Sequence, residues 1–372
     1  MPANNTKKKE HSFFQKLFIT FFVIIGLLCL ICLFVCLVNP FVDPTLFVYT
    51  SCLSLLFWPV YIVNIIVFFS LLFLRAGRFV MIPLLALMLS VPCVMKSFGF
   101  SFFEKKNEGE FKIMSYNVGN YMDIKKEKTK EEVKDNLVRI INEQNPDVIC
   151  LIESGYWNDK NAREFSQKIK CDYFYFNEEL VGKILFSKYP LEDIQQTSLY
   201  NNENKVGIMK LVNAGEKGSF LIEMVHLVSF SITKEEISFV NDAKNYVDGS
   251  DVYGKSLLKK LMMGFKKRTA DTDFILSHIK DDELPFVLCG DFNDTPISYT
   301  YHIIRSTGLH DAFIEKGKGI GETYCGNLPF LRIDYVWYNN KIDNQSFKII
   351  KEKISDHYPI VMTFNLIGDV VK

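Results

Sequence analysis

The sequence predicts an α/β domain that follows an N-terminal region of membrane-spanning helices. Residues 1–97 contain three long apolar runs, and runs of this length are typical of helices that cross a bilayer. From residue 111 onward, short apolar runs of strand length alternate with charged segments whose apolar residues recur at helical spacing. This alternation is typical of an α/β domain, and a chain of 372 residues has room for one behind the membrane region.

The three apolar runs are residues 18–38, 46–74 and 79–95. Each is near or above the roughly 17 residues that a spanning helix needs, so we expect three transmembrane helices within residues 17–97. The third run is the shortest and contains Pro83 and Pro92. A cleaved signal peptide is the alternative for the first run, but this run is longer than the roughly 7–15 apolar residues of such a peptide and two more runs follow.

The basic residues around these runs predict the orientation of the chain. Lys16 and three further lysines precede the first run, Arg75 and Arg78 separate the second from the third, and residues 39–44 contain no basic residue. Since cytoplasmic loops are rich in Lys and Arg, we expect residues 1–16 to be cytoplasmic and the domain to lie outside the cytoplasm, in a multi-pass protein of the cytoplasmic membrane. Lys96 stands on the wrong side for this topology, and two spans with a re-entrant segment would instead place the domain in the cytoplasm.

The domain is expected to occupy residues 111–367, after a linker at 98–110. A helix should contain Val133, Leu137 and Ile140 on its apolar face and end before Pro146. Strands are expected at 111–117, 147–153, 183–186, 220–226, 286–289, 332–337 and 354–362. Further helical segments are expected within 232–282 and at 299–306.

Polar residues follow or interrupt these strands. Asn117, Glu153, His226 and Asp291 each end an apolar strand, Asn293 follows two residues later, Asp334 lies inside a strand, and Asp356 and His357 precede one. A buried carboxylate such as that of Asp334 needs a partner, and His357 is the candidate. Glu153, Asp356 and Asn117 offer hard oxygen ligands, which favour Mg²⁺ or Mn²⁺ over zinc.

The stretch 285–296 carries the most chemistry. If the chain stays extended beyond Gly290, Asp291 and Asn293 project to the same side and Phe292 turns back toward the core. The alternative is an ordinary turn, because Gly, Asp, Asn and Pro are common turn residues.

The ordered motifs SYNVG, DVICLIES, VHL, GDFND, RIDYVW and SDHYPI, taken together, resemble those of the endonuclease/exonuclease/phosphatase superfamily. The resemblance covers about residues 111–367. It implies a four-layered α/β sandwich, in which two mixed β-sheets pack back to back and helices cover the outside.

The resemblance also implies roles for the residues in these motifs. Glu153 would bind the metal, with Asn117 and Asp356 in or near its coordination shell. Asp291 would be the general base and Asn293 would place water or phosphate. His226 and His357 would bind the scissile phosphate, with Asp334 orienting His357. The sequence departs from the pattern at Val225, where a polar residue usually precedes the histidine, and neither Lys205 nor Arg268 stands in a matching motif as a phosphate-binding cation.

The charge distribution limits the substrate. Residues 1–106 contain 9 Lys and Arg against 3 Asp and Glu, which leaves the remainder with 34 basic and 40 acidic residues and a net charge of −6. An acidic domain without a Lys/Arg-rich stripe interleaved with aromatic residues is poorly suited to nonspecific nucleic-acid binding. We therefore expect a phosphate-ester substrate, with a phospholipid headgroup or small ester favoured by the anchor and nucleic acid as the alternative that suits a scavenging nuclease.

Two interpretations from other classes remain at this point. The domain could be an inactive module that binds a ligand at the membrane, although every catalytic-type position holds the expected chemistry. The helices could form a small transporter or sensor, but their apolar cores contain no charged residue to line a path.

Overall fold

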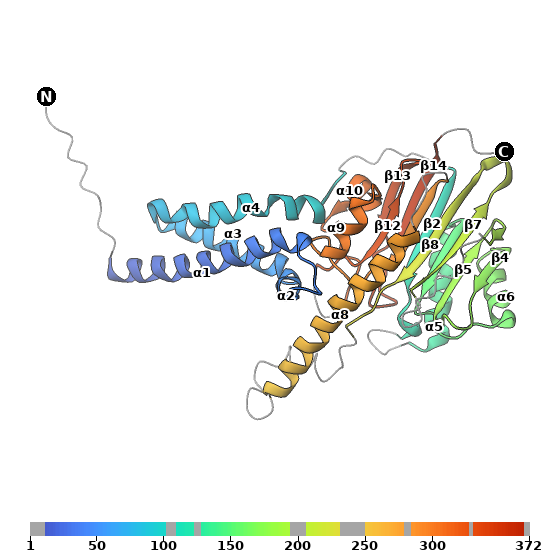
Figure 1. Cartoon of the computed structure of the whole chain (residues 1–372), viewed down its shortest axis with the longest axis horizontal. Helices are drawn as coiled ribbons and strands as arrows, with labels where there is room; N and C mark the ends of the chain where they lie inside the picture. Colours follow the sequence, from blue (N-terminus) through green and yellow to red (C-terminus); the bar gives the residue numbers. More distant parts are fainter. Residues whose placement is uncertain are drawn as a thin grey trace.

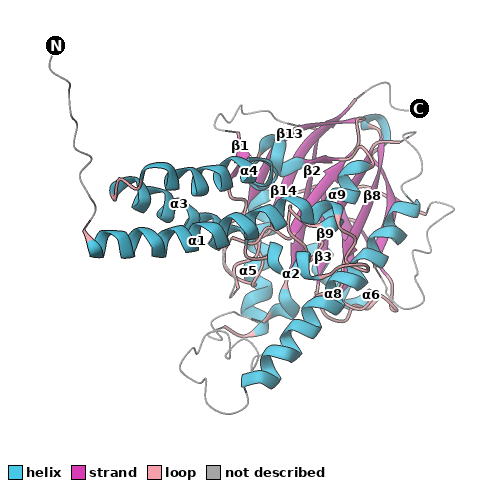
Figure 2. Ribbon diagram, turned by 60° about the vertical axis from the view of Figure 1, so that its left-hand side comes forward, coloured by secondary structure: helices cyan, strands magenta, loops and turns pink. Residues whose placement is uncertain are grey.

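The computed structural model describes residues 12–101, 109–122, 128–193, 206–230, 250–278, 284–326 and 330–367. Two β-sheets pack face to face in the α/β domain, and a bundle of N-terminal helices extends from one side of it (Figure 1). The far end of the bundle points away from the domain in both ribbon views (Figures 1 and 2).

Each large sheet has six strands, and each mixes parallel with antiparallel pairs. The first contains, in spatial order, β13 (Ile342–Ile349), β14 (Ile360–Leu366), β2 (Phe111–Asn117), β3 (Val148–Ile152), β5 (Lys183–Ser187) and β4 (Tyr173–Phe176). The second contains β10 (His310–Asp311), β12 (Asp334–Tyr338), β9 (Phe286–Asp291), β8 (Ser219–His226), β7 (Gly207–Asn213) and β6 (Leu191–Glu192). β2 runs parallel to β3 and β8 parallel to β9, whereas the other neighbours are antiparallel.

Three apolar cores hold four layers together. The central core lies between the sheets and includes Phe111, Cys150 and Phe220. Helices α5 (Lys130–Gln144) and α6 (Asp159–Lys168) cover the outer face of the first sheet. Helices α8 (Ser250–His278) and α9 (Tyr299–Ser306) cover the outer face of the second. The expected sandwich of two mixed sheets between helices is confirmed.

Helix α5 illustrates how local sequence sets these elements. Thr129 caps its N-terminus in a reciprocal capping box with Glu132, and its buried face contains Val133, Leu137, Ile140 and Ile141. The helix ends at Gln144, because Asn145 adopts a left-handed conformation just before Pro146.

The N-terminal bundle consists of α1 (Phe13–Val38), α2 (Tyr49–Ser54), α3 (Phe57–Phe73) and α4 (Met81–Ser97), with short 3₁₀ turns η1 (Asn39–Phe41) and η2 (Gly77–Val80). The helical stretches Phe13–Phe41 and Gly77–Ser97 are long and apolar enough to cross a membrane, by length and composition. Only 22% of the 18-residue apolar window in each stretch is buried, so most of the residues in these windows are at least partly exposed.

The expected single helix at 46–74 is wrong, because the structure divides this run into α2 and α3. Pro59 lies in the first turn of α3, where its missing N–H is tolerated. Its ring would clash with the carbonyl of Leu55 in a continuous helix, which favours the break between α2 and α3. Helix α3 is consequently 17 residues long, at the lower limit for a spanning helix.

The two ends of the bundle have different environments. At the far end, Gln15 Nε2 donates a hydrogen bond to the Leu74 carbonyl at 2.9 Å, which ties the start of α1 to the end of α3. At the near end, the fully buried Asn39 donates to the carbonyl of Ile297 in the α/β domain at 2.8 Å. The Asn39 Oδ1 in turn accepts a hydrogen bond from Ser51 Oγ. Bundle and domain therefore share a packed, hydrogen-bonded interface.

The chain enters the domain through a second contact. Arg332 is buried and donates to the Lys96 carbonyl at 2.9 Å, just before β1 (Gly99–Phe100) pairs with β11 (Lys318–Gly319). The expected linker at 98–110 thus begins as a strand docked on the domain. Residues 102–108 of that linker lie outside the described residues.

Candidate active site

Six strands bring the predicted polar residues to one edge of the sandwich. β2, β3, β8 and β9 end at this edge, and β12 and β14 begin there because they run antiparallel to β9 and β2. Asn117 and Asp291 are the last residues of β2 and β9, and Glu153 directly follows β3. The two sheets thus face each other across a cluster of carboxylate, amide and imidazole groups.

Asp291 lies at the centre of the cluster. Its side chain is fully buried, and its Oδ2 accepts a hydrogen bond of 2.9 Å from Asn117 Nδ2 in the opposite sheet. Gly290 makes this position possible, since its φ is +144° and a Cβ there would lie 1.9 Å from the Val225 carbonyl oxygen. Burial raises the pKa of Asp291, although His357 lowers it in part. A carboxylate with a raised pKa is suited to accept a proton.

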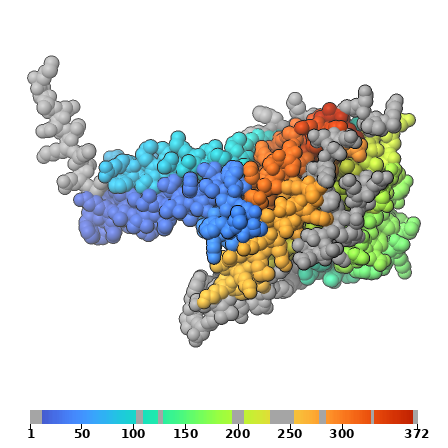
Figure 3. All heavy atoms as spheres, viewed as in Figure 1, coloured from blue at the N-terminus to red at the C-terminus, as the bar shows by residue number. Residues whose placement is uncertain are grey.

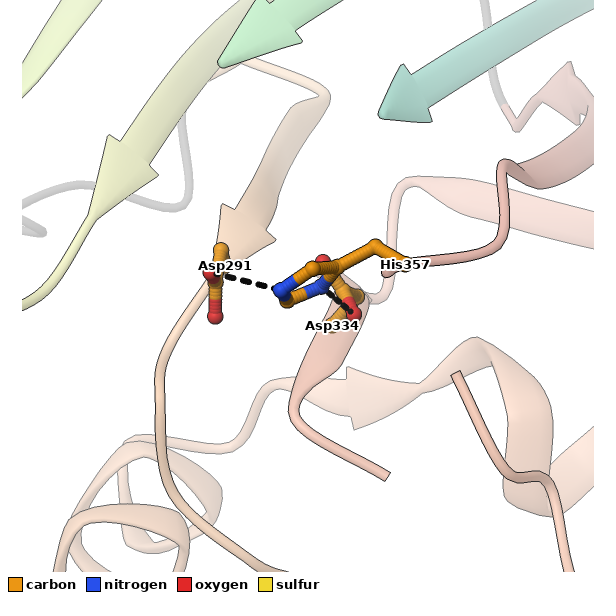
Figure 4. Close-up of side chains that lie close together, drawn as sticks. All are labelled: Asp291, Asp334 and His357. Carbon is orange, nitrogen blue, oxygen red and sulfur yellow. Dashed lines mark hydrogen bonds and ion pairs between the residues drawn. The ribbon is translucent and has the colours of Figure 1, made fainter. Parts of the chain in front are cut away.

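His357 lies between two carboxylates (Figure 4). Its Nδ1 is 2.8 Å from Asp334 Oδ2, and its Nε2 is 3.7 Å from Asp291 Oδ2. Burial by itself would lower the pKa of His357, but the charges of Asp334 and Asp291 outweigh it and raise the pKa to about 10. The imidazole is therefore protonated at neutral pH and presents a buried positive charge. The expected pairing of Asp334 with His357 is present in the structure.

His226 has the opposite character. Burial lowers its pKa to about 4, and Asp291 offsets this only in part. Its Nε2 has no hydrogen-bond partner in the described part of the chain, and it lies 3.5 Å from Glu153 Oε1 and 3.8 Å from Asp291 Oδ2. At neutral pH this imidazole is neutral, so these contacts are dipolar rather than ion pairs. The site therefore places one neutral and one charged imidazole near the same carboxylate.

Glu153 faces this group from the first sheet. Its Oε1 accepts a hydrogen bond of 3.2 Å from Asn117 Nδ2, and Asn120 Nδ2 lies 3.4 Å from its Oε2. Both Glu153 and Asn120 have positive φ, of 50° and 55°, a conformation that is uncommon outside glycine and is often found at functional sites. Sequence analysis missed Asn120, for which the neighbouring Gly119 was the available signal.

The chain turns after β9, as in the second of the two interpretations that the sequence left open. Phe292 is buried in the outer core as predicted, but Asn293 has a φ of 51° and ends the extended backbone. Its N–H donates to Asp291 Oδ1 at 2.8 Å, and its Nδ2 donates to the Leu227 carbonyl at 3.0 Å. Asn293 therefore holds Asp291 in place through its backbone. Of the two interpretations that the sequence left open, the structure therefore shows the turn, and the extended chain with both side chains on one side is not formed.

Asp334 also differs from the prediction, because it is the first residue of β12 rather than lying inside a strand. The Oγ1 of Thr323 accepts hydrogen bonds from the N–H groups of Ile333 and Asp334, so a side chain takes part in the hydrogen bonding at the point where β12 begins. Asp334 consequently sits at the site edge, where it can reach His357.

Arg268, one of the two cations considered from the sequence, contacts Asp294 rather than the cluster. Arg268 is fully buried, with its Nε 3.5 Å from Asp294 Oδ2 and its guanidinium over the ring of Phe230. Arg268 thus supports the loop after Asn293. Lys205, the other cation considered, lies outside the described residues. Lys183, which sequence analysis missed, is buried at the start of β5 and its charge contributes to the low pKa of His226.

The carboxylates of the site suit a divalent cation. Burial raises the pKa of Glu153, the Asn117 hydrogen bond lowers it, and the nearby charges of Asp291 and Asp356 raise it further. This excess of negative charge is what a bound metal would neutralise. Asp291, Asp334 and His357 also offer ligand atoms that all lie within 4.8 Å of one another and could hold a metal ion. The chain therefore offers two candidate ligand sets that share no residue: the sequence-predicted Glu153, Asn117 and Asp356, and the group of Asp291, Asp334 and His357.

Among known protein families, the Endonuclease/Exonuclease/phosphatase family matches this chain over residues 114–357. The chain belongs to this family. It is accordingly a metal-dependent phosphoester hydrolase, in agreement with the carboxylate and histidine cluster.

Two solved structures are similar to this chain, and the first of them shares its fold. The catalytic domain of human Nocturnin with bound sulfate is 20% identical, with 69% of this chain and 94% of that chain covered and a TM-score of 0.50. A mannosyl-6-phosphatase from Bacteroides thetaiotaomicron is 12% identical, with 68% and 99% covered and a TM-score of 0.46. A comparison with curated protein sequences finds no match.

Proposed function

We propose that this family member is a membrane-anchored, Mg²⁺-dependent phosphoesterase whose substrate is a phosphate ester at the bilayer surface. The observation that carries this proposal is the position of the catalytic edge next to the apolar bundle. Ile297 packs into the same apolar cluster as Leu33 and Ala86 of the bundle, and it lies only six residues after Asp291. Six residues span at most about 20 Å, so a bilayer around the bundle would lie close to the site.

The surface of the bundle supports the anchor. Large apolar side chains on its outer surface are more than half exposed, among them Phe21, Ile31, Ile66, Phe73 and Met88. An apolar surface of this extent is unfavourable in water and suits a hydrocarbon environment. We propose α1, α3 and α4 as the spans.

The arrangement of the bundle also supports the proposed topology. α1 runs toward the domain, α3 runs away from it and α4 returns (Figure 1). Arg75 and Arg78 therefore lie at the end far from the domain, together with Lys16 near the start of α1. Placing this basic end in the cytoplasm puts the domain on the opposite side of the membrane.

For the metal we favour Glu153, Asn117 and Asp356 over the set containing His357. The Nδ1 of His357 already shares a hydrogen bond of 2.8 Å with Asp334. The charged imidazole is then available to bind a phosphoryl oxygen instead of a metal. When bound, Mg²⁺ would supply Lewis-acid polarisation of the phosphoryl group.

Asp291 is the proposed general base. The Asn293 N–H and the Asn117 amide each occupy one of its oxygens, and each oxygen keeps a second lone pair for a water molecule. Asp291 would take a proton from that water as the water oxygen attacks phosphorus. The P–O ester bond would break, and the leaving alkoxide would take up a proton from solvent. His357 would bind the negative charge that develops on the phosphoryl oxygens, and Asp334 would hold its ring in position. His226 is neutral, and its Nε2 has no hydrogen-bond partner in the described chain. This nitrogen would form a hydrogen bond with the same phosphoryl group.

Two experiments test this proposal. Full-length protein in lipid nanodiscs is assayed with Mg²⁺ on phosphatidylinositol phosphates, sphingomyelin, a soluble phosphodiester and plasmid DNA, with Asp291→Asn as the inactive control. Metal-dependent turnover of a lipid ester is expected. Turnover confined to DNA would instead support a nuclease outside the cytoplasm, against which the acidic net charge of the domain argues.

The second experiment separates the ligand sets through Mn²⁺ binding, measured by electron paramagnetic resonance. Glu153→Gln is expected to weaken binding by roughly 10-fold or more, whereas Asp334→Asn should leave binding nearly unchanged. The reverse result would assign the metal to Asp291, Asp334 and His357.

A further inference from the structure

Helix α8 has an exposed stripe that the catalytic site does not use. Residues 252–270 contain five lysines and one arginine and no acidic residue. The sequence contains no basic stripe interleaved with aromatic residues. In the basic stripe on α8, leucine and methionine residues alternate with the lysines instead. The stripe consists of Lys255, Leu258, Lys259, Met262, Met263 and Lys266, which together line one shallow groove. Their spacing of three and four residues places them on one face of the helix.

The opposite face of α8 seats the helix on the domain and fixes the direction of the stripe. Phe265 is buried, and its ring packs edge-to-face on Phe230 with centroids 5.1 Å apart. Gly264 allows this contact, because a Cβ there would lie 2.7 Å from the Phe230 ring. Arg268 is buried on the same side. The stripe therefore faces outward, with Leu258 and Met263 exposed by 42% and 48%.

The stripe lies beside the end of the bundle that adjoins the domain. α2 contacts α8, and both ribbon views show the N-terminal half of α8 projecting past the domain on the bundle side (Figures 1 and 2). Figure 3 shows the surface of α8 uncovered in yellow-orange next to the blue surface of the bundle. The adjoining loop and helix add further exposed apolar side chains: Leu46, Phe47, Tyr49, Leu53 and Leu56.

We propose that the α8 stripe is a contact surface for anionic phospholipid headgroups, at the face of the bilayer next to the domain. This inference rests on the proposed membrane anchor. If the bundle spans the bilayer, the stripe lies near the level of the headgroups. Leucine and methionine side chains would enter the boundary between headgroups and acyl chains. Lys259 and Lys266 would bind phosphate groups and extend their stems along this boundary. An anionic surface is the complementary partner because the stripe carries only positive charge.

Such a contact would orient the domain on the membrane. Arg268 and Asp294 link α8 to the loop that follows Asn293, so the helix that touches lipid also supports the catalytic turn. The contact would hold the catalytic edge at a constant height above the bilayer and would weaken as salt screens the lysines.

The test uses the full chain carrying Met263→Cys, labelled with the fluorophore NBD and reconstituted in nanodiscs. The discs contain either phosphatidylcholine alone or a mixture with phosphatidylglycerol, and in both a spin-labelled lipid serves as the quencher. Labelled parent protein measures the background from the native cysteines. We expect strong quenching in anionic discs and at least about threefold less in phosphatidylcholine discs, since a surface lysine strengthens association with an anionic membrane by roughly fivefold.

Charge-reversal variants provide the matched comparison. Lys259→Glu with Lys266→Glu should abolish the difference between the two lipids. Lys160→Glu with Lys170→Glu, at exposed positions in and just after α6, makes the same charge change on the side of the domain away from the bundle (Figure 1) and should preserve the difference.

Three results would overturn the inference. Equal quenching in the two lipids would show that the lysines do not recognise anionic headgroups. An oligonucleotide that binds parent protein but not the α8 variant, with no quenching in anionic discs, would assign the stripe to nucleic acid. A chain that alkaline carbonate strips from the membrane would refute the anchor itself, whereas an integrated chain with an unquenched probe would refute only the lipid contact.

Discussion

Replacing Asp334 with Asn should move the alkaline limit of activity to lower pH. The pKa of His357 is raised from its ordinary 6.5 to about 10, mainly by Asp334 and then by Asp291. This difference corresponds to about 5 kcal/mol in favour of the protonated ring. Because Asp334 makes the largest favourable contribution, Asp334→Asn should remove roughly half of this energy or more, which lowers the pKa of His357 by roughly two.

The direction of the pH effect on kcat/KM follows from the protonated form of His357 being the active one. In the parent enzyme His357 stays protonated up to about pH 10, and it can bind phosphoryl oxygen over that range. In the variant the positive charge should be lost as pH rises above about 8, so kcat/KM should fall there while activity at pH 6 is retained in larger part. The asparagine is of similar size and preserves the packing.

The assay is kcat/KM for a soluble phosphodiester between pH 6 and 10 at saturating Mg²⁺. Asp343→Asn, an exposed carboxylate on β13, is the control and should leave the profile unchanged. If kcat/KM of Asp334→Asn fell at the same alkaline pH as that of the parent enzyme, the reasoning would be refuted, because the charge of His357 would then not depend on Asp334.

Three other predictions concern stability. Glu223 is buried without a hydrogen-bond partner in the described chain, and burial raises its pKa to about 8, so stability should fall by up to about 5 kcal/mol as pH rises from 4.5 to 8. Glu223→Gln should flatten that dependence in denaturant titrations, and an unchanged slope would contradict it. Asn39→Ala should lower stability by about 1–3 kcal/mol, because it leaves the Ile297 carbonyl without its donor, whereas Thr45→Ala should not change the melting temperature. Gly290→Ala should prevent accumulation of folded protein, since its Cβ would overlap the Val225 carbonyl; a normal melting curve would argue against that geometry.

Much of the site could be predicted from local sequence. Asn117, Glu153 and Asp291 follow apolar runs of strand length, and hydrophobic periodicity is a local property that marks where such strands end. The buried face of α5 was predictable for the same reason. The motif series then assigned these strands to one known arrangement, so the sandwich of two mixed sheets followed.

Details that depend on backbone conformation were predicted less well. The sequence left an extended chain and a turn both open at Asn293, and its N–H donates to the Asp291 carboxylate where the chain turns. Asp334 was expected inside a strand, but β12 begins at this residue, whose N–H donates to the side chain of Thr323. Both outcomes depend on hydrogen bonds whose partners compete with the sheet ladder, and strand periodicity does not report such competition.

By itself the sequence determined the identity of the chemical groups, the strands that carry them and the apolar character of the first 97 residues. Only the tertiary structure decided which groups meet. The hydrogen bond from Asn39 to Ile297 joins positions 258 residues apart, and the exposed stripe of α8 lies beside α2 because Phe265 and Arg268 seat the other face of the helix on the domain. Such contacts depend on the packing of distant segments, and the periodicity of a single segment carries no information about its partner.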